Sequence, residues 1–317
     1  MSSHQFRVNP LITQRADPFI LRHSDGYYYF TASVPEYDRL ELRRARAIAG
    51  LAEATPVDIW RKASTGPLSE LIWAPEIHHI GGAWYIYFAA APSREIKDAL
   101  FQHRIFVATT PAANPLDGPW EIKGRVDTGW DSFSLDATRF QVRATQYLVW
   151  AQKHPSIEGN SNLYIAALAN PQALATPAVM LSRPEFDWES RGFAVNEGPA
   201  VLVRGERVFL SYSASATDDR YCMGLLHAST SSDLLVPGSW SKSLRPTFTT
   251  YERRDVYGPG HNSFTVSESG EQDILVYHAR NYREIAGDPL WNPDRHTCVQ
   301  TIDWDEQGMP VFGLPIR

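Results

Sequence analysis

The sequence predicts an all-β fold, a five-bladed β-propeller with a central channel, and three observations lead to it. Five stretches of the 317 residues resemble one another, and they begin at residues 17, 74, 136, 197 and 261, at intervals of 57, 62, 61 and 64 residues. A near-constant period is typical of a repeat architecture. Each stretch passes through a polar or glycine-containing turn into an aromatic, β-branched run, which is the pattern of a β-hairpin. Further strand-like segments follow, and four strands per repeat make a propeller blade.

The second strand of each hairpin is the clearest element of the pattern. We expect these strands at residues 26–30, 83–88, 146–150, 207–212 and 273–277. Outer strands are expected at residues 105–109, 120–123, 162–166, 223–228, around Trp240, and at 297–302 and 309–312.

One segment conflicts with the repeat. Residues 38–50 have helical propensity, but the repeat requires a strand at about residues 41–46 and only a turn afterwards, and we follow the repeat. No linker rich in glycine or serine divides the chain, so residues 1–317 are expected to form one catalytic propeller domain.

Composition excludes several classes of protein. Apolar residues make up 43% and charged residues 21% of the chain, which is a globular composition. The net charge of -6 disfavours nucleic acid as a partner, and no run of 18 apolar residues is present to enter a membrane. Residues 1–7 lack the apolar segment of a signal peptide, so we expect a cytoplasmic location, although a leader could have been lost.

The two cysteines, Cys222 and Cys298, have no metal-binding spacing. Cys222 lies in an apolar strand-like run and is expected to be a buried free thiol, and a disulfide with Cys298 stays open. Oligomeric state is not indicated by the sequence.

If the five repeats close into a ring, the residues that open them meet at one mouth of the channel. These are Asp17, Ala74, Asp136, Glu197 and His261. Three carboxylates near one axis are costly unless they share protons or bind a ligand, and such groups gather where shifted pKa values are useful. Glycoside hydrolysis needs a carboxylic acid that protonates the leaving oxygen and a carboxylate that activates water or attacks the sugar.

Each of these residues also has a structural interpretation. Asp17 precedes a proline and could cap a turn, Asp136 could do the same, and Glu197 precedes Gly-Pro, where an exposed turn glutamate is ordinary. Their common place in the repeat favours a joint site, because independent turn residues need not fall in phase. His261 could be a core histidine, or could enter the channel and orient a water or an ion.

Two further residues are candidates for substrate binding. Trp73 could stack on a sugar face at the channel mouth or pack in the core. Arg280 could pair with a channel carboxylate or bind a sugar hydroxyl, or be a surface arginine.

The motifs that open the repeats resemble glycoside hydrolase family 43 in all five repeats and in order. They are Arg-Ala-Asp-Pro at 15–18, Trp-Ala-Pro-Glu at 73–76, Ser-Leu-Asp-Ala at 134–137, Asn-Glu-Gly-Pro at 196–199 and Gly-His-Asn-Ser at 260–263. The resemblance implies a five-bladed propeller and an inverting mechanism, which requires carboxyl groups about 6.5–9.5 Å apart.

The resemblance also implies a role for each matching residue. Asp17 is similar to the general base, Glu197 to the general acid, and Asp136 to the residue that tunes and orients the acid. His261 matches a channel histidine often near a bound ion, commonly calcium, so it is the candidate metal ligand although no cofactor is expected to be required. Arg280 matches an arginine near the acids. Trp73, Ala74, His261 and Arg280 are the expected substrate-binding residues.

Residues 9–20 and 27–38 are most similar to the exo-acting α-L-arabinofuranosidase branch of this family. The resemblance implies release of arabinose from α-1,5-linked arabino-oligosaccharides or arabinan. A β-xylosidase or an endo-arabinanase of the same fold is the alternative, and a non-catalytic sugar-binding propeller is the alternative from another class. Exo action requires one blocked end of the channel mouth, and the segment 92–103 is a candidate wall.

Overall fold

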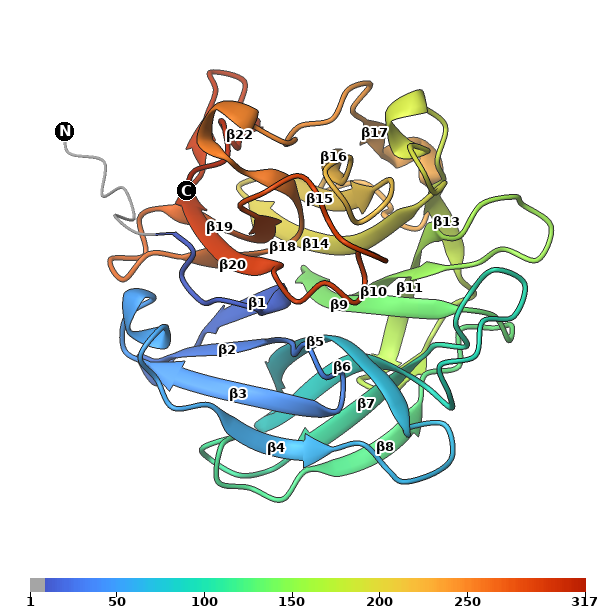
Figure 1. Ribbon diagram of the computed structural model, residues 1–317, viewed down its shortest axis with the longest axis vertical. Coiled ribbons are helices and arrows are strands. Elements are labelled where there is room, and N and C mark those ends of the chain that lie inside the picture. The colour runs from blue at the N-terminus through green and yellow to red at the C-terminus, as the bar shows by residue number, and fades with distance from the viewer. Residues whose placement is uncertain (1–8) are drawn as a thin grey trace.

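The strands form sheets arranged radially around a central axis in the computed structural model, which describes residues 9–317 (Figure 1). Blade 1 contains β1 (Ala16–Arg22), β2 (Tyr28–Ser33), β3 (Arg39–Ala45) and β4 (Val57–Arg61). Blade 2 contains β5 (Glu70–Ile80), β6 (Ala83–Ala91), β7 (Arg104–Thr110) and β8 (Glu121–Arg125). Blade 3 contains β9 (Ser134–Val142), β10 (Thr145–Gln152), β11 (Asn162–Asn170), β12 (Ala173–Leu174) and β13 (Val179–Ser182).

The remaining strands complete the ring. Blade 4 contains β14 (Asn196–Arg204), β15 (Arg207–Ala214), β16 (Cys222–Ser229) and β17 (Ser241–Lys242). Blade 5 contains β18 (Tyr257–Val266), β19 (Asp273–Arg280) and β20 (His296–Thr301), and a separate hairpin follows with β21 (Asp303–Trp304) and β22 (Pro310–Val311). The helices of the described residues are single 3-10 turns, η1 (Ala49–Leu51), η2 (Asp187–Glu189), η3 (Pro237–Ser239) and η4 (Glu252–Arg254). The all-β, five-bladed prediction is confirmed.

The ambiguous segment 38–50 follows the repeat. It forms β3, which pairs with β2 and β4, and then the single turn η1. The helical propensity of its Arg, Leu, Glu and Ala residues is overridden because Leu40 and Leu42, which point to the same face of a strand, are completely buried in the core between blades.

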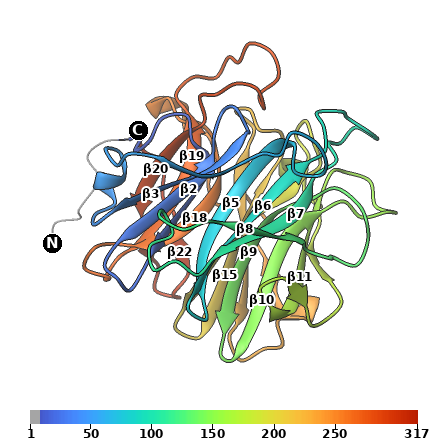
Figure 2. The ribbon, with the colours of Figure 1, turned by 90° about the horizontal axis from the view of Figure 1, so that it is seen from below.

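The fifth blade differs from the expected four-stranded pattern. Residues 309–312 were expected to supply its outer strand, but they pair with β21 instead. The N-terminal segment takes that place, since the backbone of Ile12 pairs with Thr297 of β20 and the Asn9 side chain bonds both backbone groups of Val299, at 3.0 Å each. Blade 5 also lies beside blade 1 in both ribbon views (Figures 1 and 2). The two ends of the repeat array are thereby joined, which closes the ring.

The core consists of the layers between neighbouring blades. The second strands carry its largest rings, among them Trp84, Trp150, Tyr212 and Tyr277, which have almost no exposed surface. Each such strand is flanked by strands of its own blade and by the faces of neighbouring blades, so its aromatic residues are favoured on both sides. Cys222 and Cys298 are both buried and free, which confirms the free thiol at Cys222 and excludes the disulfide in this structure.

Among residues 9–317, no helix has the length and apolar character needed to cross a bilayer.

Candidate active site

The inner strand of every blade has an irregular register close to its start, where it leaves the pairing pattern with the second strand. At each irregularity one residue has a left-handed backbone, with φ of 54° at Asp17, 46° at Ala74, 57° at Asp136, 52° at Gly198 and 40° at His261. This conformation is unfavourable for residues other than glycine and is concentrated at functional sites. Bulges of this kind redirect side chains, and here they direct them toward the axis.

Glu197 was expected to be the equivalent residue of blade 4, and this expectation is wrong by one position. The left-handed residue is Gly198, where a Cβ atom would lie 3.0 Å from the His261 ring, so only glycine fits without displacing that ring. In the sequence, a proline directly follows each of Asp17, Ala74 and Gly198. These prolines mark the three residues as equivalent positions of their blades.

Glu197 nevertheless faces the site because it belongs to a second set of positions. The residue just before the left-handed one lines the pocket in three consecutive blades, as Trp73, Leu135 and Glu197. Blade 4 therefore presents its carboxylate from the neighbouring position, at a different angle from Asp17 and Asp136.

These two sets of positions line a cavity of about 270 Å³ at the channel mouth. Its floor contains the three predicted carboxylates together with His261, and Arg295 and Tyr221 join them. Its upper walls are mainly apolar and include Ile96, Leu100, Phe101, Phe133, Phe193 and Leu290.

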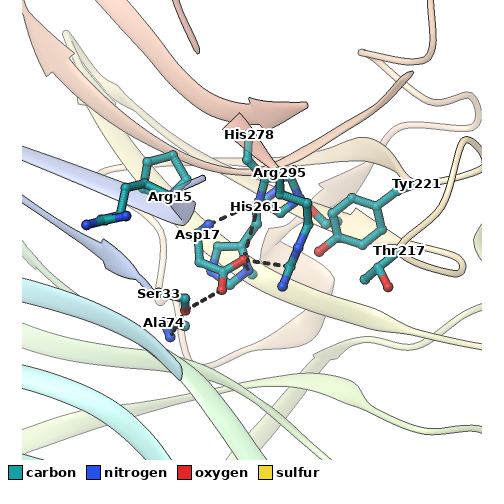
Figure 3. A network of polar contacts seen from close by, with 12 residues as sticks. Arg15, Asp17, Ser33, Ala74, Thr217, Tyr221, His261, His278 and Arg295 are labelled. Carbon is teal, nitrogen blue, oxygen red and sulfur yellow. Dashed lines mark hydrogen bonds and ion pairs between the residues drawn. The ribbon is translucent and has the colours of Figure 1, made fainter. Parts of the chain in front are cut away.

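Asp17 is held by contacts on all sides (Figure 3). The Ser33 hydroxyl donates to its Oδ2 at 2.6 Å, Arg295 Nη1 donates to Oδ1 at 3.3 Å, and His261 Nδ1 lies 3.3 Å from Oδ1. The backbone N–H of Asp17 donates to His278 Nδ1 at 3.0 Å, so that nitrogen is an acceptor, and burial lowers the pKa of His278 to about 3.

The result is a carboxylate that stays ionised. Burial alone would raise the pKa of Asp17, but the charges of His261 and Arg295 outweigh it and hold this pKa well below the ordinary value. The Arg295 contribution is present at every relevant pH, because an arginine keeps its charge. An ionised carboxylate at the floor of a pocket can accept a proton from a water molecule bound there.

Glu197 has the opposite environment. Burial raises its pKa to about 7, the hydrogen bond that Tyr221 donates to its Oε1 at 2.8 Å lowers it, and the charge of Asp17 raises it again. Asp136 is also raised well above its ordinary pKa, by burial and then by the charges of Glu197 and Asp17. Asp136 Oδ2 accepts the N–H of Gly198 at 3.0 Å, which fixes it beside the Glu197 backbone.

Two carboxyl groups with pKa values pushed apart are the arrangement of an acid–base pair. Asp17 is suited to accept a proton, and Glu197 is suited to donate one near neutral pH. Asp136 and Glu197 repel each other when both are ionised, so their protons titrate as a coupled pair.

Trp73 and Ala74 occupy different environments at the same bulge. Trp73 lines the pocket with 9% of its surface exposed, while its ring stacks on His103 with centroids 4.0 Å apart. The ring is therefore mainly packed, and only an edge can reach a ligand. Ala74 does not belong to the pocket lining described above. Its N–H donates to Ser33 Oγ at 2.8 Å, and Ser33 in turn holds Asp17.

Arg280 does not take the place that the resemblance implied. Its guanidinium donates to the backbone oxygens of Thr217 and Pro289, at 2.6 and 2.8 Å, and to Asn292 Oδ1 at 3.1 Å. All three nitrogens are therefore used in hydrogen bonds to neighbouring loops. Arg295 is instead the arginine beside Asp17.

Arg295 and Tyr221 were both missed in the sequence. Each lies outside the motifs that open the repeats, and neither has a distinctive flanking pattern. A search for cations and hydroxyls just before β20 and β16 would have found them, because both residues lie at the channel-mouth ends of those strands.

Calcium at His261 stays a prediction, and the donors around it do not fit that ion. Calcium takes six to eight oxygen ligands. The His261 ring has Asp17 Oδ1 at 3.3 Å and Asp136 Oδ2 at 4.0 Å, and Arg295 already neutralises Asp17. Within residues 9–317, no group of three or more His, Cys, Asp or Glu side chains is arranged to hold a metal.

Replacing Tyr221 with Phe is expected to move the alkaline limb of the pH profile upward. The tyrosine hydroxyl stabilises ionised Glu197, so its removal raises the pKa of this acid and keeps it protonated to higher pH. A hydrogen bond to a charged group contributes about 1.5–3 kcal/mol, which corresponds to a shift of about one pH unit or more. The kcat/KM profile measures this shift, with the acidic limb as internal control. An unchanged or lowered alkaline limb would contradict the assignment.

Comparison with known proteins identifies the family to which the chain is similar. Residues 8–310 match the model for glycosyl hydrolases family 43. The chain is 52% identical to an extracellular exo-α-(1→5)-L-arabinofuranosidase of Streptomyces avermitilis over 98% of this chain and 63% of that protein. It is 53% identical to an enzyme of the same name from Streptomyces chartreusis, over 89% of this chain and 84% of that protein. The crystal structure of an α-L-arabinofuranosidase from Lactobacillus brevis superposes with a TM-score of 0.96 at 54% identity, over 98% of this chain and 97% of that one.

The cytoplasmic location predicted from residues 1–7 is contradicted by these comparisons. Both Streptomyces relatives are named extracellular enzymes. The prediction is wrong because it rested on a few terminal residues alone, and those lie outside the described residues.

Proposed function

The chain belongs to glycosyl hydrolase family 43, and on that premise we propose that it is an exo-acting α-L-arabinofuranosidase that releases arabinose from α-1,5-linked arabino-oligosaccharides or arabinan. The chain spans 63% of the length of the Streptomyces avermitilis relative, so the activity is proposed for the propeller itself. The observation that carries the proposal is the pairing of an ionised Asp17 with a Glu197 whose pKa is about 7. The two relatives named extracellular support a secreted protein.

The mechanism uses both groups in one step. Asp17 removes a proton from water as the water oxygen attacks the anomeric carbon of the arabinosyl unit. The bond from that carbon to the glycosidic oxygen breaks, and Glu197 gives its proton to this oxygen. The charge of Asp17 disfavours ionised Glu197 and so helps to keep this acid protonated. Asp136 accepts the N–H of Gly198 next to Glu197, while Arg295 and Ser33 hold Asp17 in place.

The walls of the pocket support exo action. In the segment 92–103, Arg94 lies over the Trp291 ring, with its guanidinium carbon 5.1 Å from the ring centroid. Phe101 meets the same ring edge-on at 6.3 Å, and Tyr37 donates its hydroxyl to Leu290 O at 2.5 Å. Loops of blades 1, 2 and 5 are thereby joined on one side of the mouth. Joined loops on one side of the mouth support binding of a chain end rather than of a continuous polymer.

The test of the proposal is product analysis with three substrates. Reduced α-1,5-arabinotriose, an aryl α-L-arabinofuranoside and an aryl β-D-xyloside are incubated with the enzyme. We expect stepwise release of arabinose from the non-reducing end and little xyloside cleavage. Release of xylose alone would favour a β-xylosidase, and arabinobiose as the first product would favour endo action. No cleavage of any of the three would leave a sugar-binding propeller.

The stereochemistry of the product is a separate prediction. If Asp17 activates water rather than attacking the sugar, the configuration at the anomeric carbon is inverted, and α-linked substrate yields β-L-arabinofuranose first. Proton NMR in the first minutes of hydrolysis distinguishes the two anomers before they equilibrate. An enzyme-free sample of arabinose gives the equilibrium ratio. Initial appearance of the α-anomer would show retention and remove the assignment of Asp17 as a base.

A further inference from the structure

Two left-handed residues of the ring donate their backbone N–H to a serine of the preceding blade. Ser33 Oγ of blade 1 accepts the N–H of Ala74 of blade 2 at 2.8 Å. Ser213 Oγ of blade 4 accepts the N–H of His261 of blade 5 at 2.7 Å. The two serines occupy equivalent positions, since each lies on the second strand of its blade, opposite the residue just before the left-handed one. This position therefore holds the bulge of the next blade.

In blade 5 a histidine occupies the equivalent position. His278 lies on β19 opposite Gly260, the residue before the left-handed His261. Its Nδ1 accepts the N–H of Asp17 at 3.0 Å, across the junction between blades 5 and 1 (Figure 3). Because Nδ1 is an acceptor, the ring is neutral and carries its hydrogen on Nε2. A buried neutral ring thus fixes the left-handed backbone from which the Asp17 carboxylate projects.

The ring of His278 makes a second contact that a serine is too small to make. It lies parallel to the Tyr221 ring, with 6° between the two planes and 5.6 Å between the centroids. Tyr221 also rests on the backbone of Gly260, where a Cβ atom would lie 2.5 Å from two carbons of the tyrosine ring. Gly260 and His278 are paired across their strands, so together they form the surface that supports Tyr221.

These two contacts connect His278 with both halves of the acid–base pair. One reaches Asp17 directly, and the other reaches Glu197 through Tyr221, whose hydroxyl donates to Glu197 Oε1 at 2.8 Å. His278 itself is not among the residues that line the pocket. It is therefore placed to act on the reaction through its neighbours.

We propose that His278 is a positioning residue for both carboxyl groups, holding the Asp17 backbone through Nδ1 and holding Tyr221, and thereby Glu197, through the face of its ring. The inference rests on the proposed function, in which Asp17 and Glu197 act in one step. Small displacements of reacting groups are costly, and a misplacement of about 1 Å can reduce the rate about 10²-fold. Loss of either contact should therefore slow the reaction although both carboxyl groups remain.

Two substitutions separate the contacts. His278→Phe keeps a ring against Tyr221 but leaves the buried N–H of Asp17 without its acceptor. Its kcat/KM is expected to fall about 10-fold on both arabinotriose and a reactive aryl arabinofuranoside, because both need activated water. His278→Asn keeps an acceptor close to the place of Nδ1 but removes the ring. Its loss, also about 10-fold, should be confined to arabinotriose, which needs the acid.

The pH profile of kcat/KM on arabinotriose supplies a readout that a purely structural role would not move. Without the ring, Tyr221 is less well held and its bond to ionised Glu197 weakens, so the alkaline limb of His278→Asn should move upward. The alkaline limb of His278→Phe should stay in place. In a Tyr221→Phe background, His278→Asn should add no further shift, because the bond through which it acts is already absent.

The matched control is Tyr277→Phe, on the same strand. Tyr277 is completely buried, points to the opposite face of β19, and donates its hydroxyl to Gln300 Oε1 and Ile316 O at 3.1 Å each. This variant should lower Tm but leave the ratio of the two substrates and the alkaline limb unchanged. If His278→Phe does not fold, His278→Asn and the double variant decide the question.

Three results would overturn the role of His278. They are wild-type kinetics in either variant, equal losses on both substrates in both variants with an unchanged alkaline limb, and a further shift in the double variant. Each leaves the proposed function intact. If the wild-type enzyme cleaves only the xyloside, the proposed substrate fails, and the same comparison on xylo-oligosaccharides and aryl xylosides still tests His278. No cleavage of any substrate would remove both proposals.

Discussion

Replacing Glu197 with Gln is expected to reduce kcat/KM on arabino-oligosaccharides by about 10²–10⁴-fold. The glutamine cannot protonate the departing sugar alkoxide, which is a poor leaving group. An aryl arabinofuranoside with a strongly acidic phenol needs little protonation, so its hydrolysis should fall much less. Steady-state kinetics on both substrates measure this difference, and Glu206→Gln, an exposed glutamate in the turn of the same blade, is the control. Near-full activity of Glu197→Gln on arabinotriose would contradict the acid assignment.

The same substitution should change how stability depends on pH. The pKa of Glu197 is raised from 4.5 to about 7 in the folded state, so between these values the folded chain binds a proton that the unfolded chain has lost. The free energy of unfolding of the wild type therefore falls, through this group, as pH rises from about 4.5 to 7, and levels off above. Glutamine does not titrate. The Tm of Glu197→Gln relative to wild type should thus increase across this window, which thermal unfolding at pH 4.5, 6 and 8 measures.

Replacing Asp17 with Asn should produce a loss of similar size, about 10²–10⁴-fold, but with a different dependence on the substrate. Water must be activated whichever group departs, so arabinotriose and the reactive aryl arabinofuranoside should both lose activity. The two variants together separate the roles, because only the acid variant is rescued by a good leaving group. An Asp17→Asn enzyme that kept activity on the aryl substrate would point to Asp17 as a structural residue.

A chemical rescue supplies the control for Asp17. Asp17→Gly leaves space beside Arg295, and glycine accepts the left-handed backbone at this position. Azide needs no deprotonation, so it should attack the anomeric carbon from the side that water uses, while Glu197 protonates the leaving oxygen. The expected product is β-L-arabinofuranosyl azide, formed in proportion to azide concentration. Azide should not rescue Glu197→Gln on arabinotriose.

The sequence was sufficient for the ring of blades because its signal is repeated. The aromatic second strands are buried on both sides in every blade, so five weak patterns at one period reinforce one another. Blade 5 was the exception, since pairing between residues 9–12 and β20 joins segments more than 280 residues apart and has no local pattern.

The site was only partly predictable for a related reason. Asp17 and Asp136 are the first residues of their repeats, and their equivalent positions in the repeat were enough to predict them. Glu197 was predicted one residue away from its true repeat position, because a bulge adds a residue that a regular strand does not have. Arg295 lies 15 residues beyond Arg280, on the far side of a loop. Which of the two arginines reaches Asp17 depends on how that loop folds back, which no local pattern records.

The left-handed backbone at Ala74 has a consequence for protein engineering. Blade 2 keeps the same conformation as blades 1 and 3, with φ of 46°, although its methyl group can neither ionise nor hydrogen-bond. The fold already bears the conformational cost of this position, so a polar replacement would add no new backbone strain. Asp and Asn tolerate this conformation better than most residues. Blade 2 therefore already provides the backbone conformation for a further Asp or Asn, at a position that Ala74 fills with a buried methyl group.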